Sequence, residues 1–187
     1  MSGVSPAPVA GAGVGTSERQ AAAPMRKPAK DLRGIDVAIP GRRRRLRITR
    51  VVLDFNGTLA VDGKLVRGIA ARIKRLARWL EVVVITADTF GSARRFLADL
   101  PVTVHVVRQG AEKRRLVESY GRAGVAAVGN GTNDVPMFKA AALAIAVCGV
   151  EGTAAELLRV ATVLVRDVND ALDLLLRPTR LRATLRR

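Results

Sequence analysis

The chain has 187 residues, of which 49% are apolar and 3% aromatic, and it carries a formal net charge of +16. This length suits one domain with a single hydrophobic core, and the composition favours an α/β domain over an all-β sandwich. The single cysteine, Cys148, excludes an internal disulfide, and the absence of a membrane-length apolar run or secretory signal predicts a cytoplasmic protein that does not contact a membrane.

The positive charge is concentrated at the two ends of the chain. Residues 1–50 carry 11 Lys/Arg against 3 Asp/Glu, residues 177–187 carry 5 against none, and residues 51–176 carry 16 against 13. Two interpretations stay open: an electrostatic surface for nucleic acid or an acidic partner, or solvated Arg-rich extensions. We favour the second, because no aromatic side chain is interleaved with these charges to stack on bases.

Three regions follow from composition. Residues 1–33 are rich in Ala, Gly and Pro without periodicity, which predicts a disordered tail. Residues 34–176 form the predicted catalytic domain, and residues 177–187 a basic C-terminal tail. The domain opens with a short strand or a hairpin that turns at Pro40 and Gly41.

From Val51 onward, continuous apolar runs alternate with amphipathic segments. The pattern predicts a Rossmann-like three-layer α/β sandwich with a mostly parallel central sheet. The expected strands are 51–54, 81–86, 102–107, 125–128, 143–147 and 162–165, and the expected helices are 68–80, 91–100, 112–120, 134–142, 154–158 and 167–176. We expect Trp79, Phe96 and Cys148 in the core, and His105 on a strand with a satisfied partner or facing solvent.

Polar residues stand at or just after successive strand ends: Asp54, Thr86, Lys113 and the turn 130–134. Each alone is an ordinary cap, turn former or surface residue. Ligands of such sheets bind beyond the carboxyl ends of the strands, so their joint occurrence predicts one site there.

These residues resemble a known set of motifs. DFNGTLA at 54–60, TAD at 86–88, the lone Lys113 and GNGTND at 129–134 are similar to the four motifs of the haloacid dehalogenase superfamily of phosphotransferases. The nearest likeness is to the phosphorylation domain of P-type ATPases and to small soluble proteins like it, and it spans about residues 51–176.

The resemblance implies a role for each matching residue. Asp54 is the nucleophile that forms an aspartyl-phosphate, and the phosphorylated substrate is bound by Thr86, Ala87, Lys113 and Asn133. Lys113 also neutralises the charge of the phosphoryl group, and Asn133 orients groups beside Lys113. Asp88 either lines the site or caps the following helix.

The resemblance also implies a Mg²⁺ site. Its oxygen ligands are Asp54, the backbone carbonyl of Asn56, Asn130 and Asp134. Two of these positions depart from the family, since Asn56 replaces the acid/base Asp of the phosphatases and Asn130 replaces a metal-binding Asp. We therefore expect slow turnover and weakened Mg²⁺ binding, with Asn56 counted among the catalytic positions.

Only 27 residues run from Leu59 to Ile85, which leaves no room for a cap domain or an ATP-binding insert. An open site indicates a large phosphorylated substrate, or closure by a neighbouring subunit in a homo-oligomer. The leading hypothesis is a Mg²⁺-dependent phosphohydrolase. The alternatives are a non-catalytic module that senses phosphate, metal or a protein partner, and a nucleic-acid-associated protein that binds through its basic ends.

Overall fold

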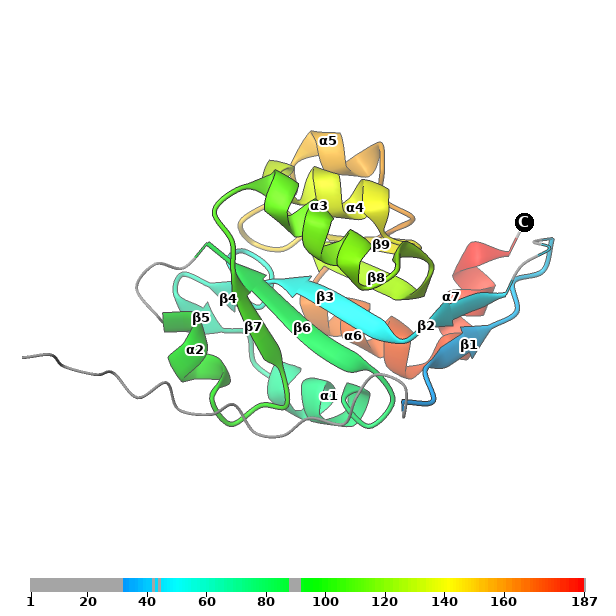
Figure 1. The fold of residues 1–187 in the computed structure, drawn as a ribbon, viewed down its shortest axis with the longest axis horizontal. Coiled ribbons are helices and arrows are strands. Elements are labelled where there is room, and N and C mark those ends of the chain that lie inside the picture. Colours follow the sequence, from blue (N-terminus) through cyan, green and yellow to red (C-terminus); the bar gives the residue numbers. More distant parts are fainter. Residues whose placement is uncertain (1–31, 42, 44, 88–91, 187) are drawn as a thin grey trace, which may run out of the picture.

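A six-stranded parallel sheet forms the centre of the molecule in the computed structural model, which describes residues 32–41, 43, 45–87 and 92–186 (Figure 1). Its strand order is β10-β9-β8-β3-β6-β7. The strands are β3 (Arg50–Asp54), β6 (Glu81–Thr86), β7 (Thr103–Val106), β8 (Val125–Gly129), β9 (Leu143–Val147) and β10 (Val163–Val165). The predicted mostly parallel α/β fold is confirmed. The expected disorder of the first residues and the role of Asp88 concern residues 1–31 and 88–91, which lie outside the described part.

Helices cover both faces of this sheet (Figure 1). Alternate residues of each strand point to opposite faces, so one strand contributes apolar side chains to both layers. Val51 and Leu53 of β3 belong to the apolar cluster of one face and Val52 to that of the other. The first face is covered by α1 (Ile69–Leu76), α2 (Ser92–Leu97) and α6 (Val168–Leu176), and the second by α3 (Gly110–Ser119), α4 (Val135–Ala140) and α5 (Ala155–Leu158). Helix α7 (Pro178–Leu185) lies beside the sheet and packs against α6 and the leading hairpin. No helix in the described part of the chain is long and apolar enough to span a membrane.

Two short hairpins flank the sheet. The predicted leading hairpin is present: β1 (Ile35–Val37) pairs antiparallel with β2 (Leu46–Ile48), and its buried face packs beside α7. A second hairpin, β4 (Ala60–Val61) with β5 (Lys64–Leu65), follows the first motif. It turns at Asp62 and Gly63, whose φ values of 49° and 71° fit the tight turn of a two-residue hairpin.

The C-terminal segment that the sequence set apart as a basic tail is helical. Helix α7 begins with Pro178 in its first turn, a position where the missing N–H of proline costs nothing. Leu181 and Leu185 are four residues apart, so they share one helix face, and both are buried in the first apolar cluster. The segment is therefore part of the folded body, with its arginines on the outer face.

Three core assignments were wrong. Trp79 and Phe96 are 45% and 44% exposed, and Cys148 is exposed. Helix α1 ends at Leu76, four residues earlier than expected, so Trp79 lies beyond the helix and is not held on its apolar face. In α2 the inward positions belong to Ala93 and Leu97, and Cys148 follows the last residue of β9.

Candidate active site

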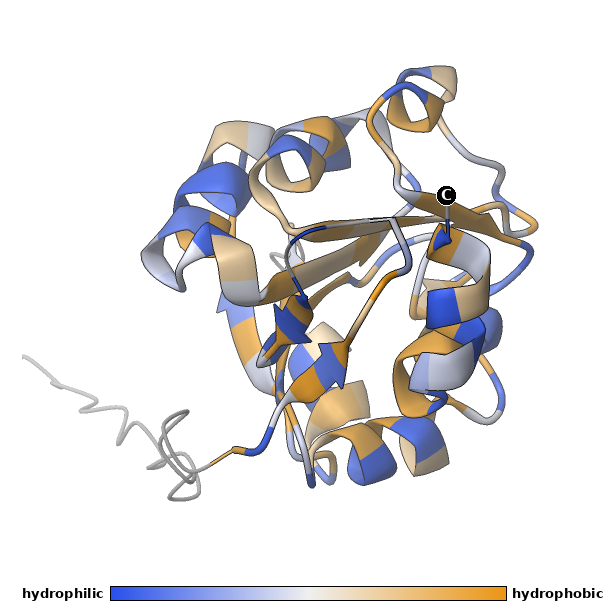
Figure 2. Ribbon diagram, turned by 90° about the vertical axis from the view of Figure 1, so that its right-hand side faces the viewer, coloured by the Kyte–Doolittle hydropathy of each residue, from blue (hydrophilic) through white to orange (hydrophobic). Residues whose placement is uncertain are grey.

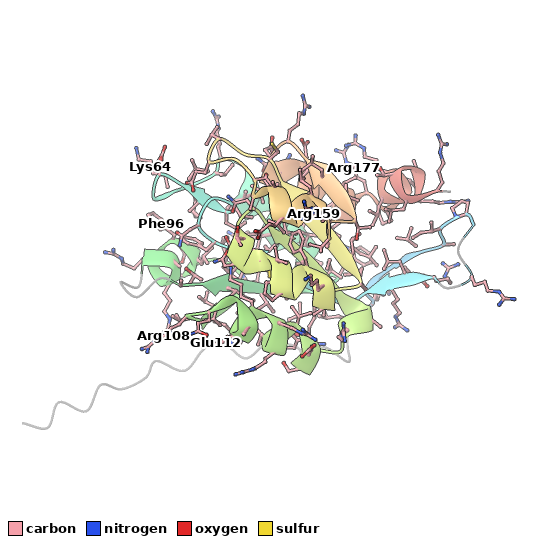
Figure 3. All side chains as sticks on the ribbon, turned by 90° about the horizontal axis from the view of Figure 1, so that it is seen from above. Lys64, Phe96, Arg108, Glu112, Arg159 and Arg177 are labelled. Atoms are coloured by element: carbon pink, nitrogen blue, oxygen red, sulfur yellow. The ribbon has the colours of Figure 1, made fainter. Side chains whose placement is uncertain are left out.

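The carboxyl ends of the central strands meet at the side of the sheet where its connections reverse. Asp54 ends β3, Thr86 ends β6 and Gly129 ends β8. The helix after β3 covers one face and the helix after β8 the other, so a crevice opens between these strands. Figure 3 labels Lys64, Phe96 and Arg108 at this end of the molecule, with Arg177 toward the other end.

A buried ion triad occupies this end. The Lys113 ammonium, on the first turns of α3, donates hydrogen bonds of 2.6 Å to Oδ1 of Asp54 and of 2.6 Å to Oδ1 of Asp134. The exposed fractions are 6% for Asp54, 2% for Lys113 and 0% for Asp134. Two carboxylates thus share one cation away from solvent, where charge interactions are strong.

The triad shifts the protonation of its members. Burial, followed by the negative charge of Asp134, raises the pKa of Asp54 to about 7, against the opposing effect of Lys113. Burial alone would lower the pKa of Lys113, but the charges and hydrogen bonds of the two carboxylates outweigh it and raise that pKa. Lys113 therefore stays charged, and Asp54 exchanges its proton near neutral pH.

The turn after β8 wraps around Asp134. Its Oδ2 accepts hydrogen bonds from the backbone N–H groups of Asn130 at 3.1 Å and Gly131 at 3.0 Å. A Cβ at position 129 would overlap this carboxylate, so glycine is required there. Both oxygens of Asp134 are engaged by protein donors, which makes it well placed to orient Lys113.

Asn130 joins two loops through its side-chain amide. Its Oδ1 accepts a 3.1 Å hydrogen bond from the buried Thr58 hydroxyl, and its Nδ2 donates a 3.2 Å bond to the carbonyl of Gly152. A carboxylate could replace the first contact but not the second, since it has no donor. The hydrogen bond to Gly152 thus explains why an amide rather than a carboxylate stands at position 130, which the motif comparison did not reveal.

Sequence reasoning missed Glu151. Its Oε2 and the Asn130 amide both lie within 2.9 Å of the point where a Cβ on Gly57 would stand, and Gly57 has a φ of 74°. Its Oε1 accepts a 3.2 Å hydrogen bond from the backbone of Asp62. The available signal was an acid in the short loop after β9, where Gly149 and Gly152 flank Val150 and Glu151.

The other predicted residues lie at the same end of the sheet. Thr86 is buried, whereas Asn56, Ala87 and Asn133 are exposed in the loops that follow the strands. Their roles stay predictions. His105 is paired, as expected, through a 3.0 Å hydrogen bond between its Nε2 and the Tyr120 hydroxyl.

The donors suit a divalent cation only in part. The described residues include no cluster of three or more His, Cys, Asp or Glu side chains able to hold a metal. The predicted hard donors at this end of the sheet are Asp54, the Asn56 carbonyl, the Asn130 amide oxygen and Asp134, and their role as metal ligands stays a prediction. Mg²⁺ is commonly held by one or two carboxylates together with substrate phosphate oxygens, and this set fits such an arrangement.

Comparison with solved structures identifies the fold. The cobalt-bound 3-deoxy-D-manno-octulosonate 8-phosphate phosphatase of Haemophilus influenzae superposes with a TM-score of 0.58 and 18% identity, covering 70% of this chain and 88% of that one. The enzyme of the same name from Moraxella catarrhalis, solved with magnesium, phosphate and the sugar acid, gives 0.56 and 15%, covering 70% and 86%. This chain has the haloacid dehalogenase fold. The resemblance drawn from the four motifs is confirmed at this level, and the narrower likeness to P-type ATPases stays a prediction.

Sequence comparison adds one family relationship. The chain is 47% identical over 62 residues to the uncharacterized protein MJ0073 of Methanocaldococcus jannaschii. The matched segment covers 33% of this chain and 67% of the archaeal protein. The chain belongs to the same family as that protein, whose name carries no activity. No protein-family model matches the chain.

Proposed function

We propose that the protein is a slow, Mg²⁺-dependent phosphohydrolase that works through an aspartyl-phosphate on Asp54. The observation that carries this proposal is the buried Lys113 ammonium, 2.6 Å from Asp54, at the carboxyl end of the central strand. The haloacid dehalogenase fold, and the phosphatase activity in the names of the two superposed structures, support it.

In this proposal Asp54 acts in its ionised form. One of its carboxylate oxygens attacks phosphorus, the bond to the leaving oxygen breaks, and water then cleaves the acyl phosphate to regenerate the carboxylate. Lys113 stabilises negative charge on the transferred group, and Asp134 orients Lys113. Thr86, Ala87 and Asn133 contact phosphoryl oxygens. A cation held by Asp54, the Asn56 carbonyl, Asn130 and Asp134 would supply further charge stabilisation.

Slow turnover follows from Asn56. Its exposed amide has no proton to exchange at neutral pH, so the leaving oxygen must depart unprotonated or take its proton from water. Losing a general acid of this kind costs about 10² to 10⁴ in rate. Substrates with good leaving groups, such as aryl or acyl phosphates and phosphoanhydrides, are therefore the class that this site favours.

The open site favours a large substrate. Between the first motif and α1, the chain inserts only the short β4–β5 hairpin, which is far smaller than a cap domain. A bulky phosphorylated molecule could reach Asp54 from solvent, and a second subunit could serve as the missing cover. The homo-oligomer and the cytoplasmic location stay proposals.

The decisive experiment is turnover of p-nitrophenyl phosphate with Mg²⁺, run beside Asp54→Asn. We expect slow release of phosphate that requires Asp54, together with a mass increase of one phosphoryl group on the protein after acid quench. Intact-mass measurement must first show that Asn56 and Asn130, both followed by glycine, have not deamidated to Asp. Absent turnover with retained binding of a phosphate analogue would instead establish the sensor hypothesis.

A further inference from the structure

The end of the molecule away from the catalytic crevice carries a cleft between its leading hairpin and three helices. This basal cleft has a volume of about 490 Å³ and lies between β1, the end of α1 and the junction of α6 with α7. Ile35, Leu175 and Pro178 contribute to its walls, and Arg75, Arg78 and Trp79 lie along one side. Its size is that of a small-ligand site, and no proposed catalytic residue lines it.

Trp79 is the unusual member of the basal cleft. It is the only tryptophan of the chain and is 45% exposed, although such a ring is normally largely buried. Its backbone is fixed, since its N–H donates to Leu76 at 2.8 Å and its carbonyl accepts from Gly34 at 3.0 Å. The cleft therefore presents an exposed indole on a hydrogen-bonded backbone, and the exposed cations Arg75 and Arg78 line the same cleft.

A basic surface continues from the basal cleft along the β1–β2 hairpin and α7. The described residues of 36–49 and 174–186 include seven arginines and one carboxylate, Asp36, while Asp173, just before the second stretch, interacts with Arg177 and Arg180. Asp36 pairs with Arg45 at 2.7 Å. Arg182 and Arg186, one helical turn apart, line a second hollow of about 290 Å³ with Pro40 of the hairpin turn. Figure 2 faces this end and shows hydrophilic residues along both elements. The seven are Arg43, Arg45, Arg47, Arg177, Arg180, Arg182 and Arg186.

The arginine and indole side chains of this surface indicate what kind of partner it binds. The positive charges of this surface belong to arginine, whose planar guanidinium group binds phosphate oxygens through two parallel hydrogen bonds. An exposed indole beside arginines offers a stacking platform for an unpaired base. In a duplex the bases are already stacked and cannot reach such a ring. The sequence-level argument against nucleic acid was the lack of an aromatic among the charges, and the fold supplies one.

We propose that the basal cleft and the adjoining arginine surface bind single-stranded nucleic acid, with one base on Trp79 and the phosphates along the hairpin and α7. This site is independent of the proposed phosphohydrolase site. Asp54→Asn is accordingly expected to bind the strand as the wild type does, so failure of either proposal leaves the other intact.

Binding is measured with a fluorescein-labelled 12-nucleotide oligo(U) by anisotropy and with unlabelled oligo(U) by tryptophan fluorescence. We expect quenching of Trp79 that saturates with the anisotropy signal. Because each neutralised phosphate of a single strand contributes about 0.7 to the salt slope, four contacts predict about a 50-fold loss of affinity between 50 and 200 mM salt.

Variants separate stacking from charge. Trp79→Ala is expected to weaken binding roughly 5-fold or more, with the salt slope unchanged. The pair Arg182→Ala and Arg186→Ala is expected to weaken binding and to lower the slope by about 1.4. The matched control is Arg94→Ala with Arg95→Ala, an equal charge change on exposed α2 residues near the other end, and it is expected to change affinity less than 2-fold. Thermal melts establish that each variant is folded.

Several outcomes would overturn the proposal. Equal weakening by the two arginine pairs would mean non-specific attraction to a basic protein. Tighter binding of a duplex of the same length, or binding of oligo(U) without quenching of Trp79, would contradict the stacking of a base on Trp79. Quenching by anionic phosphatidylserine vesicles but not by oligo(U) would assign the surface to a membrane instead.

Discussion

The Lys113 ammonium lies 2.6 Å from Oδ1 of Asp54, although the two residues are 59 positions apart in the chain. The same ammonium contacts Asp134 at the same distance, so one buried cation serves two buried carboxylates. When both carboxylates are ionised, the triad carries one net negative charge in a low-dielectric site, an arrangement that costs folding stability.

Removing the shared cation should destabilise the fold strongly. Lys113→Met leaves two buried carboxylates without a counter-charge, which typically costs about 3–5 kcal/mol in the free energy of unfolding. Urea unfolding at pH 8 measures the loss, and the loss should shrink at pH 5, where the carboxylates can take up protons. The control is Lys139→Met on the exposed side of α4, expected to change stability by less than about 0.5 kcal/mol. Equal losses in the two variants would contradict a buried triad.

The raised pKa of Asp54 gives a pH dependence with a defined sign. Its pKa in the folded protein is about 7, above the ordinary value of 3.8, so the folded state binds a proton that the unfolded state has released between these values. This contribution to stability is present at low pH and is lost as the pH rises through 7. Asp54→Asn lacks this titration. We expect urea unfolding to show the wild type losing stability relative to Asp54→Asn between pH 5 and 8, and a constant difference would refute the shift.

Activity should follow the same group. If ionised Asp54 is the nucleophile, kcat/KM for p-nitrophenyl phosphate rises with pH, with a midpoint near 7, and levels off at higher pH. Asp134→Asn removes a negative neighbour that raises this pKa, so the midpoint of the residual activity should move to lower pH even though the overall rate falls. A midpoint that stays in place would separate the pH dependence from Asp54.

Restoring a proton donor at position 56 should accelerate turnover. Asn56→Asp places a carboxyl group on an exposed loop position, so we expect little change in stability and a gain in kcat of about 10² to 10⁴ for an alkyl phosphate. The gain should be smaller for p-nitrophenyl phosphate, whose leaving group needs no proton. The double variant with Asp54→Asn should be inactive. An inert Asn56→Asp would place the slow step elsewhere.

Asn130→Asp should have opposite effects on stability and on cation binding. The carboxylate loses the hydrogen bond to the Gly152 carbonyl and faces that oxygen with a charge, a cost of about 1–3 kcal/mol. The same charge should tighten Mn²⁺ binding, measured by calorimetry or electron paramagnetic resonance. Asn169→Asp at the start of α6 is the matched control, because its Nδ2 likewise donates a 3.2 Å hydrogen bond to a backbone carbonyl, that of Arg67, and Asn169 is not a proposed cation ligand. Unchanged Mn²⁺ affinity in Asn130→Asp would exclude position 130 from the cation site.

The sheet and its strand-end residues were predictable because apolar runs and turn residues are local signals. Buried strands such as 81–86 and 143–147 were placed to the residue. Contacts made across the fold were not predictable: Asp134 turns both oxygens to protein donors, and Glu151 reaches Gly57 from another loop. Trp79 was misplaced because the end of α1 depends on where the chain must enter β6, which helical periodicity does not reveal.

The C-terminal helix supplies the remaining test of the fold. From the sequence, residues 177–187 are predicted to be a solvated basic tail, in which two leucines stand among arginines. In the structure Leu181 is fully buried in the same apolar cluster as β1 and α6. Leu181→Ala should therefore cost about 2–5 kcal/mol in the free energy of unfolding, because it leaves a cavity in the core. Thr184→Ala, exposed on the same helix, should cost less than about 1 kcal/mol. Comparable small losses in the two variants would indicate that residues 177–187 do not pack on the core. The basic surface that they share with the hairpin would then have no fixed geometry.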